Sequence, residues 1–216
     1  MVWVNAVVQG VLLGGLYALF AAGLSLVFGV MRLVNLAHGD FAVLSAYLAL
    51  LLVETKSIHV TNDISIGWFP LLTFVTAVVV LVGLQLLIRR TSLGRALRAT
   101  SDDRRAAQLV GIDNRRPYAV AMAISVATAA VAGIFLGIRT TFDPSAGPVR
   151  LIFAFEAVVI GGLGSLWGTL VGGAVLGVAQ AIGAQISPGW GTLAGHFVFL
   201  AVLLVRPTGL FRTAPA

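Results

Sequence analysis

Three ionisable side chains lie inside or between long apolar runs of this sequence, where each could do chemistry within a membrane. Glu156 and His196 stand within such runs, and His38 lies in the short polar break "VNLAHGD". A carboxylate in lipid is costly unless it is paired, protonated or facing water. We therefore expect Glu156 either to pair with another helix or to line a solute pathway, and His196 to bond a neighbouring helix. Asn35 and His38 are expected to cap helix ends, with a place in a pathway gate as the alternative.

The motifs of several enzyme classes are absent from the sequence. It has no Gly-x-x-x-x-Gly-Lys-Ser/Thr phosphate loop, and Lys56 is its only lysine. It also lacks a Gly-x-Ser-x-Gly elbow, a His-Glu-x-x-His zinc motif and any cysteine. We therefore expect no enzyme, no ATPase site, no metal and no cofactor, so that energy for uphill transport would have to come from another protein.

The segment from residue 89 to 117 holds eight of the fourteen basic residues. It predicts two short helices, the first capped by Thr91 or Ser92 and the second by Ser101. Asp102 and Asp103 would then lie in the first turn of the second helix, where carboxylates suit the positive end of the dipole.

Each of these two helices is expected to have a small apolar face. Apolar residues recur at i, i+3 and i+4 in both, as Leu93, Ala96 and Leu97 and then as Ala106, Leu109 and Val110. Gly111 is a good C-terminal stop for the second helix. Such a pair fits either a surface of anionic lipid headgroups or a groove in a soluble partner, and we favour the partner.

The composition indicates a membrane protein. Of the 216 residues, 59% are hydrophobic and 10% are charged, whereas soluble domains carry about 25% charge. The net charge of +6 is better explained by the orientation of a membrane protein than by nucleic-acid binding, because excess arginine marks cytoplasmic loops.

The apolar runs predict an all-α polytopic membrane protein of about seven transmembrane helices, with a range of six to eight, in one domain over residues 1–216. The second and fifth runs are short, and either could be a re-entrant half-helix. The positive-inside rule places the loop 89–117 in the cytoplasm, which puts the N-terminus outside and the C-terminus in the cytoplasm. The runs cover residues 4–30, 41–53, 70–88, 118–138, 151–163, 166–186 and 192–205.

Glycines recur at helical spacing in several runs, which predicts close packing of helix backbones. The stretch "IGGLGS" is too rich in glycine for a regular helix, and Ser165 could cap the helix that follows. We therefore expect a helix break over Gly161, Gly162, Gly164 and Ser165, and broken helices in transporters often line the substrate route. The spaced glycines are Gly10 and Gly14, Gly133 and Gly137, Gly164, Gly168 and Gly172, and Gly173 and Gly177.

Several stretches together resemble the branched-chain amino acid permease family of ABC importers, of the LivH type. "RAAQLVG" at 105–111 is similar to the EAA-type coupling motif, with Arg105 where that motif has glutamate. The other matching stretches occur in the family's order: "GLSLVFGVMRLVNLAHGDF" at 23–41, "LGRALRAT" at 93–100, "AVVIGGLGSLWGTLVGG" at 157–173 and "LLVRPTGLF" at 203–211. Family members usually have a longer stretch, with additional helices, where residues 54–66 stand here.

The resemblance implies a permease subunit in the bacterial inner membrane that carries branched-chain amino acids or related amino acids and amides. It implies two ABC ATPase subunits, a second LivM-like permease subunit and a periplasmic substrate-binding protein as partners, besides membrane lipid, and no nucleic acid. The residues expected to contact the ATPase are Arg104, Arg105, Ala106, Ala107, Leu109 and Gly111.

Two other functions remain open from the sequence. One is an ion-coupled secondary transporter of small polar solutes, with Glu156 or His196 carrying the proton. The other is an intramembrane protease, for which Ser25 and His196 are the conceivable pair, although neither has a supporting motif.

Overall fold

The computed structural model describes residues 2–54, 68–139 and 143–211. Each of the seven apolar runs overlaps one helix of 15 residues or more, so the all-α polytopic fold is confirmed. Within the described residues, five stretches are long and apolar enough to cross a membrane, and α9 is a shorter apolar helix. The helices are α1 (Val2–Met31), α2 (His38–Glu54), α3 (Trp68–Arg90), α4 (Ser92–Asp102), α5 (Arg104–Leu109), α6 (Arg115–Arg139), α7 (Gly147–Gly161), α8 (Leu166–Ile186) and α9 (Trp190–Val205), with a short 3-10 turn at Pro144–Ala146.

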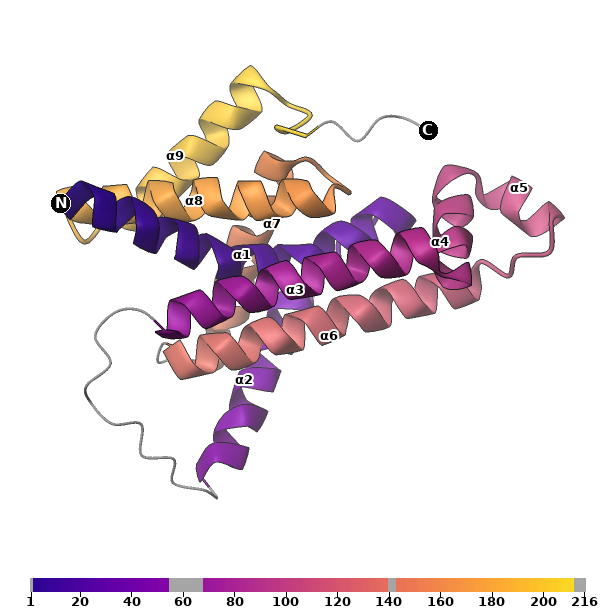
Figure 1. Cartoon of the computed structure of the whole chain (residues 1–216), viewed down its shortest axis with the longest axis horizontal. Coiled ribbons are helices and arrows are strands. Elements are labelled where there is room, and N and C mark those ends of the chain that lie inside the picture. Colours follow the sequence, from indigo (N-terminus) through magenta and orange to yellow (C-terminus); the bar gives the residue numbers. More distant parts are fainter. Residues whose placement is uncertain (1, 55–67, 140–142, 212–216) are drawn as a thin grey trace.

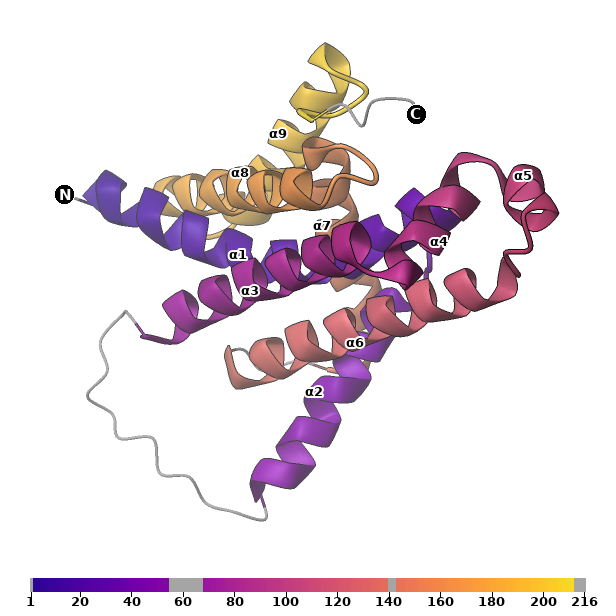
Figure 2. The same cartoon turned by 45° about the vertical axis from the view of Figure 1, so that its right-hand side comes forward.

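Helix α1 forms the centre of the bundle. It is apolar all round, as expected of a helix that is enclosed by others, and it packs against α3, α6, α7 and α8. Helices α4 and α5 lie together at one end of the molecule, and the N-terminus lies at the opposite end (Figures 1 and 2). The central helix therefore reaches from one end of the bundle to the helix pair at the other.

Glycines bring α1 and α8 into direct backbone contact. A Cβ atom added at Gly10 would lie 2.5 Å from the Cα of Val178, and one added at Gly173 would lie 2.5 Å from the carbonyl oxygen of Gly14. Neither distance leaves room for a side chain. The spaced glycines of α1 and α8 therefore face each other, as close packing of helices in lipid requires.

Helix α8 uses a second glycine face to pack against α7. A Cβ atom at Gly168 would overlap the carbonyl oxygen of Gly161, and one at Gly172 would overlap that of Ala157. Helix α8 thus packs closely against both α1 and α7 through its glycines.

Helix α2 begins deep inside the bundle, not at its surface. Its first residue, His38, is fully buried, and its Nε2 lies 2.8 Å from the carbonyl oxygen of Phe20. Phe20 precedes the end of α1 by 11 residues, or roughly 16 Å at the rise of an α-helix. The chain therefore turns back into the bundle after α1, which explains why the second apolar run is short.

Helix α7 starts beside the start of α2. A Cβ atom at Gly39 would overlap the carbonyl oxygen of Gly147, and one at Gly147 would overlap the Asp40 carboxylate. The two short runs of the sequence thus form the two helices whose N-terminal ends meet inside the molecule.

The glycine contact between α1 and α8 gives a stability prediction. Gly14→Leu should lower the free energy of unfolding by about 1–3 kcal/mol, the usual cost of overpacking, because its side chain would meet the backbone of Ala174. The loss would appear as a lower thermal midpoint of the detergent-solubilised protein.

Gly83→Leu is the matched control, because a Cβ atom at Gly83 on α3 would meet nothing within 4 Å. We expect this variant to unfold at or above the wild-type midpoint, since glycine weakens a helix interior. Equal midpoints for the two variants would contradict the packing of α1 on α8.

Candidate functional site

The segment predicted as two short helices forms α4 and α5. Thr91 caps α4, with its side-chain oxygen accepting from the Gly94 N–H at 3.0 Å. The prediction that Ser101 caps the second helix is wrong. Asp103 caps α5 instead, accepting from the N–H groups of Arg105 and Ala106 at 2.7 and 3.1 Å.

Ser101 instead joins α4 to the end of α1. Its hydroxyl donates to the carbonyl oxygen of Gly29 at 2.6 Å. Nearby, the Arg104 guanidinium donates to the carbonyl oxygen of Met31 at 2.9 Å. The last carbonyls of a helix have no partner within it. Side chains from the junction of α4 and α5, residues 101–104, therefore cap the central helix; we call this junction the elbow. A displacement of the elbow must therefore strain or move the end of α1.

Asn114 ties the elbow to the start of α6. Its amide donates to the carbonyl oxygen of Arg104 at 3.0 Å, and its Oδ1 accepts from the Thr100 hydroxyl at 3.3 Å. The Arg104 guanidinium also lies 5.2 Å from the centre of the Tyr118 ring, within the range of a cation–π contact. No local pattern singles out Asn114, because its role depends on Thr100 and Arg104, 14 and 10 residues away along the chain.

Gly111 ends α5 in a Schellman motif. It has a φ of 87°. Its N–H donates to the carbonyl oxygen of Gln108, and the N–H of Ile112 donates to the carbonyl oxygen of Ala107 at 2.9 Å. This pattern needs a residue in the left-handed region, which favours glycine. The predicted C-terminal stop is therefore located as expected.

Two large apolar side chains are exposed at the end of α5. Leu109 is 89% exposed and Val110 is 76% exposed, whereas Ala107 is buried. The expected apolar face of Ala106, Leu109 and Val110 therefore points away from the bundle, and Ala107 faces inward. In α4 the expected face does point inward, since Leu97 is buried.

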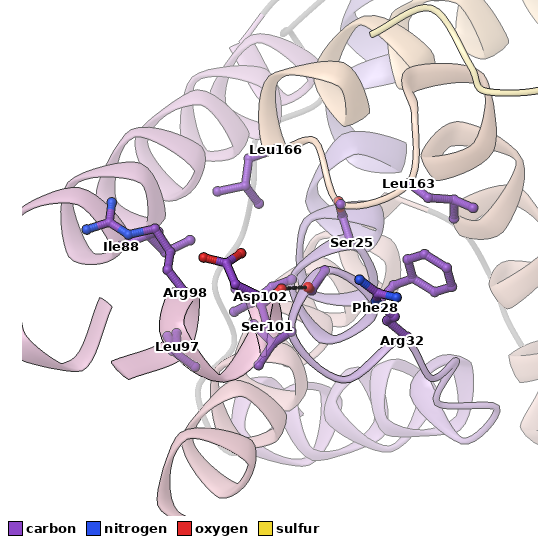
Figure 3. Close-up of a pocket in the computed structure, with 14 residues that line it drawn as sticks. Ser25, Phe28, Arg32, Ile88, Leu97, Arg98, Ser101, Asp102, Leu163 and Leu166 are labelled. Atoms are coloured by element: carbon purple, nitrogen blue, oxygen red, sulfur yellow. Dashed lines mark hydrogen bonds between the residues drawn. The ribbon is translucent and has the colours of Figure 1, made fainter. Parts of the chain in front are cut away.

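A cavity of about 540 Å³ lies at the junction of these elements, between the end of α1, helix α4 and the turn that joins α7 to α8. Figure 3 shows Asp102 near its centre, with Arg98 on one side of the view and Arg32 on the other. The residues that line it are Ser25, Leu26, Phe28, Gly29, Val30, Arg32, Ile88, Leu97, Arg98, Ser101, Asp102, Leu163, Gly164 and Leu166.

The predicted break between α7 and α8 is present in the structure. Gly162 and Gly164 have positive φ angles of 106° and 82°, and the Ser165 hydroxyl caps α8 by accepting from the Gly168 N–H at 3.1 Å. Gly164 lies against Gly29, since a Cβ atom added at Gly29 would lie 3.4 Å from the Cα of Gly164. The turn therefore reaches the end of the central helix.

The "RPTGLF" stretch closes the end of α7. The N–H groups of Leu210 and Phe211 donate to the carbonyl oxygens of Ile160 and Gly161 at 2.8 and 3.0 Å. Gly209 has a φ of 79° and packs against Gly162. Residues far apart in the sequence thus complete one helix end.

Glu156 and His196 pair with each other across α7 and α9. The imidazole Nδ1 and a carboxylate oxygen of Glu156 are hydrogen-bonded, and no other ion pair is found within the described residues. The His196 ring also stacks on Phe153, with ring centres 6.0 Å apart. The contact agrees with the expectation for His196 and with one of the two alternatives for Glu156, that of pairing with another helix.

Asn35 and His38 lie apart from that pair. Asn35 accepts from the N–H of Ala37 at 3.1 Å, and the His38 Nδ1 lies 3.2 Å from the hydroxyl oxygen of Ser125 on α6. The pathway residues suggested by the sequence are therefore found in three places, at the α7–α9 contact, at the α7–α8 turn and at the start of α2. Of these residues, Gly164 lines the cavity.

The Glu156–His196 contact predicts thermodynamic coupling between α7 and α9. In a double-mutant cycle of Glu156→Ala and His196→Ala, we expect a coupling free energy of about 0.5–3 kcal/mol, the range for residues in contact. Thermal midpoints of the four purified proteins would measure it. Additive effects of the two substitutions would contradict the contact.

Comparison with known proteins identifies the family. A family model described as branched-chain amino acid transport system / permease component matches residues 6–59 and 54–206. The high-affinity branched-chain amino acid transport system permease protein BraD of Pseudomonas aeruginosa is 27% identical, over 96% of this chain and 95% of that protein. The corresponding protein LivH of Escherichia coli is 26% identical, over 94% of this chain and 93% of that protein. No solved structure matches.

The alignments also show where this chain is short. The alignment with the Pseudomonas protein extends over 292 residues, more than the 216 of this chain, so that relative contains residues without a counterpart here. The two matches of the family model meet at residues 54–59, in the region where the sequence is expected to be shortened. The matched residues include α4, α5 and the turn between α7 and α8. Because the family model matches most of the chain, the chain belongs to the branched-chain amino acid transport system permease family.

Proposed function

We propose that this chain is a permease subunit of an ABC importer for branched-chain amino acids, or for related amino acids and amides. The names of its relatives support the substrate class. The single observation that carries the proposal is the outward apolar surface of α5, which stands on an elbow bonded to the end of the central helix.

The exposed surface of α5 suits a protein groove. Leu109 and Val110 project from a six-residue helix, and an apolar helix face that lies in a partner's groove is a common mode of recognition. Arg104 and Arg105 flank the surface with positive charge, and Gly111 fixes its end. Ala106 lies on the exposed side, while Ala107 anchors the helix inward.

The elbow provides a route from the docking surface to the spans. When the partner ATPase closes on ATP, a shift of α5 would be transmitted through Ser101 and Arg104 to the last carbonyls of α1. Because α1 packs against four other spans, its tilt would rearrange the bundle between two states. Glu156, the turn at Gly161–Ser165, and the pair Asn35 and His38 are the groups proposed along the solute route.

The proposed assembly follows the family. It has two ATPase subunits, a second permease subunit and a periplasmic substrate-binding protein, in the inner membrane of a bacterium. The chain itself supplies no ATPase site. The cluster of arginines at the α4–α5 end supports a cytoplasmic location for residues 89–117, an external N-terminus and a cytoplasmic C-terminus. An ion-coupled transporter would leave the apolar surface of α5 without a partner.

Gly111 allows a graded test of the coupling surface. A Cβ atom there would meet nothing within 4 Å, but the φ of 87° is unfavourable for β-branched residues and tolerated by asparagine. We expect Gly111→Val to lose nearly all leucine uptake in membrane vesicles and Gly111→Asn to keep a substantial part of it. Both variants should insert at the wild-type level, and wild-type uptake by Gly111→Val would remove α5 from the coupling role.

Leu109 tests the partner directly. Leu109→Asp should reduce the recovery of phosphate-loop ATPase subunits with the tagged permease at least tenfold, because it places a charge in the proposed apolar contact. Its thermal midpoint should stay at the wild-type value, since the side chain is 89% exposed. Undiminished recovery of ATPase subunits would contradict the docking surface.

A further inference from the structure

The cavity beside α4 contains polar groups that have no partner in the described chain. Ser25 is fully buried, its hydroxyl makes no hydrogen bond, and it lines the cavity. Arg32, Arg98 and Asp102 line the same space with exposed side chains, and the ion pair found among the described residues lies elsewhere. A buried hydroxyl without a partner is costly, so the Ser25 hydroxyl points to a ligand, and the charged groups beside it are free to bind one.

Two helix ends of opposite polarity also border the cavity. Gly29 and Val30 belong to the C-terminal turn of α1, and Leu166 is the first residue of α8. The C-terminal end of a helix attracts cations and the N-terminal end attracts anions. The cavity is therefore bordered by groups of both signs, with the side chains of Arg98 and Asp102 as the open ones.

The rest of the lining is mainly aliphatic. Leu26, Leu97 and Leu166 are buried and, with Leu163, form apolar wall. Sites for small molecules are commonly of this size and kind, an apolar pocket with a few polar groups that fix the orientation of the ligand.

We propose that this cavity binds a free α-amino acid with an aliphatic side chain, from the face of the membrane on which α4 and α5 lie. Arg98 receives the carboxylate and Asp102 receives the ammonium group, because both charged ends of a zwitterion then find opposite charge. The side chain lies on the leucines, and the Ser25 hydroxyl gains a partner. A phosphate headgroup suits the site less well, since it would meet the Asp102 carboxylate.

Occupancy of the cavity acts on the coupling elbow. Arg98 and Asp102 belong to α4, Ser25 belongs to α1, and Arg32 directly follows α1. A ligand held by both elements adds a second link beside the Ser101–Gly29 hydrogen bond and stabilises the arrangement in which elbow and helix are joined. An amino acid that has been imported thus slows further import by binding to this cavity. This regulatory role rests on the proposed function.

The test measures binding of radiolabelled leucine to the full-length permease in nanodiscs of phosphatidylcholine, without ATPase or binding protein. We expect saturable binding that Arg98→Gln and Asp102→Asn each weaken about tenfold, as expected for loss of one charge-assisted hydrogen bond. Ser25→Ala should weaken it severalfold. Arg95→Gln is the matched control, because Arg95 is an exposed arginine of α4 outside the cavity lining, and it should stay within twofold of wild type.

Two analogues and a second lipid identify the ligand chemistry. Leucinamide lacks the carboxylate and 4-methylpentanoate lacks the ammonium group, and we expect each to compete at least tenfold less well than leucine. Phosphatidylglycerol in the nanodisc should leave leucine binding unchanged. The proposal is overturned if leucine does not bind saturably, if Arg98→Gln and Asp102→Asn bind like wild type, if 4-methylpentanoate competes as well as leucine, or if phosphatidylglycerol displaces leucine.

A transport measurement then tests the regulation. Leucine loaded on the α4–α5 side of vesicles that hold the whole importer should reduce uptake by wild type severalfold, and that by Arg98→Gln much less. Equal reduction in both would overturn the regulatory role. Failure of the ATPase to bind the permease would refute the proposed importer and leave the binding result intact, so the two proposals fail separately.

Discussion

The structure depends on the close approach of α8 to two neighbours at once. Lipid tails are as apolar as leucine, so helices in a membrane gain little from burying apolar side chains against each other and associate through backbone proximity and packing. Helix α8 meets α1 through Gly173 and Gly177 and meets α7 through Gly168 and Gly172. The central helix, the α7–α8 turn and the cavity beside them are all placed by these contacts.

Helix ends form the second organising element, because a carbonyl or N–H group left open inside a membrane protein needs a partner. The end of α1 is capped by Ser101 and Arg104, and the end of α7 by the N–H groups of Leu210 and Phe211. Each end is thus joined to a segment distant in sequence. The same bonds that satisfy the backbone also connect the short helices at one end of the molecule with its spans.

The sequence predicted the elements well and their partners less well. Hydrophobic runs located the five candidate spans of the described residues, and the glycine pattern located both the helix contacts and the break at Gly161–Ser165, because these signals are local. Ser101 was assigned the wrong role, since its hydroxyl is taken by the Gly29 carbonyl oxygen, which no local pattern reveals. Likewise, the spacing of Ala106, Leu109 and Val110 indicates a common face but not whether it points inward or outward. Glu156 and His196 were singled out separately, and only the fold shows that they pair.

The closure of α7 by the "RPTGLF" stretch has a consequence for biosynthesis. Leu210 follows its partner Ile160 by 50 residues, and chains emerge from the ribosome N-terminal end first. Helix α7 is therefore synthesised, and two further spans follow it, before the residues that complete its end exist. The last turn of α7 can therefore reach its final hydrogen bonding only after all of α8 and α9 has been synthesised.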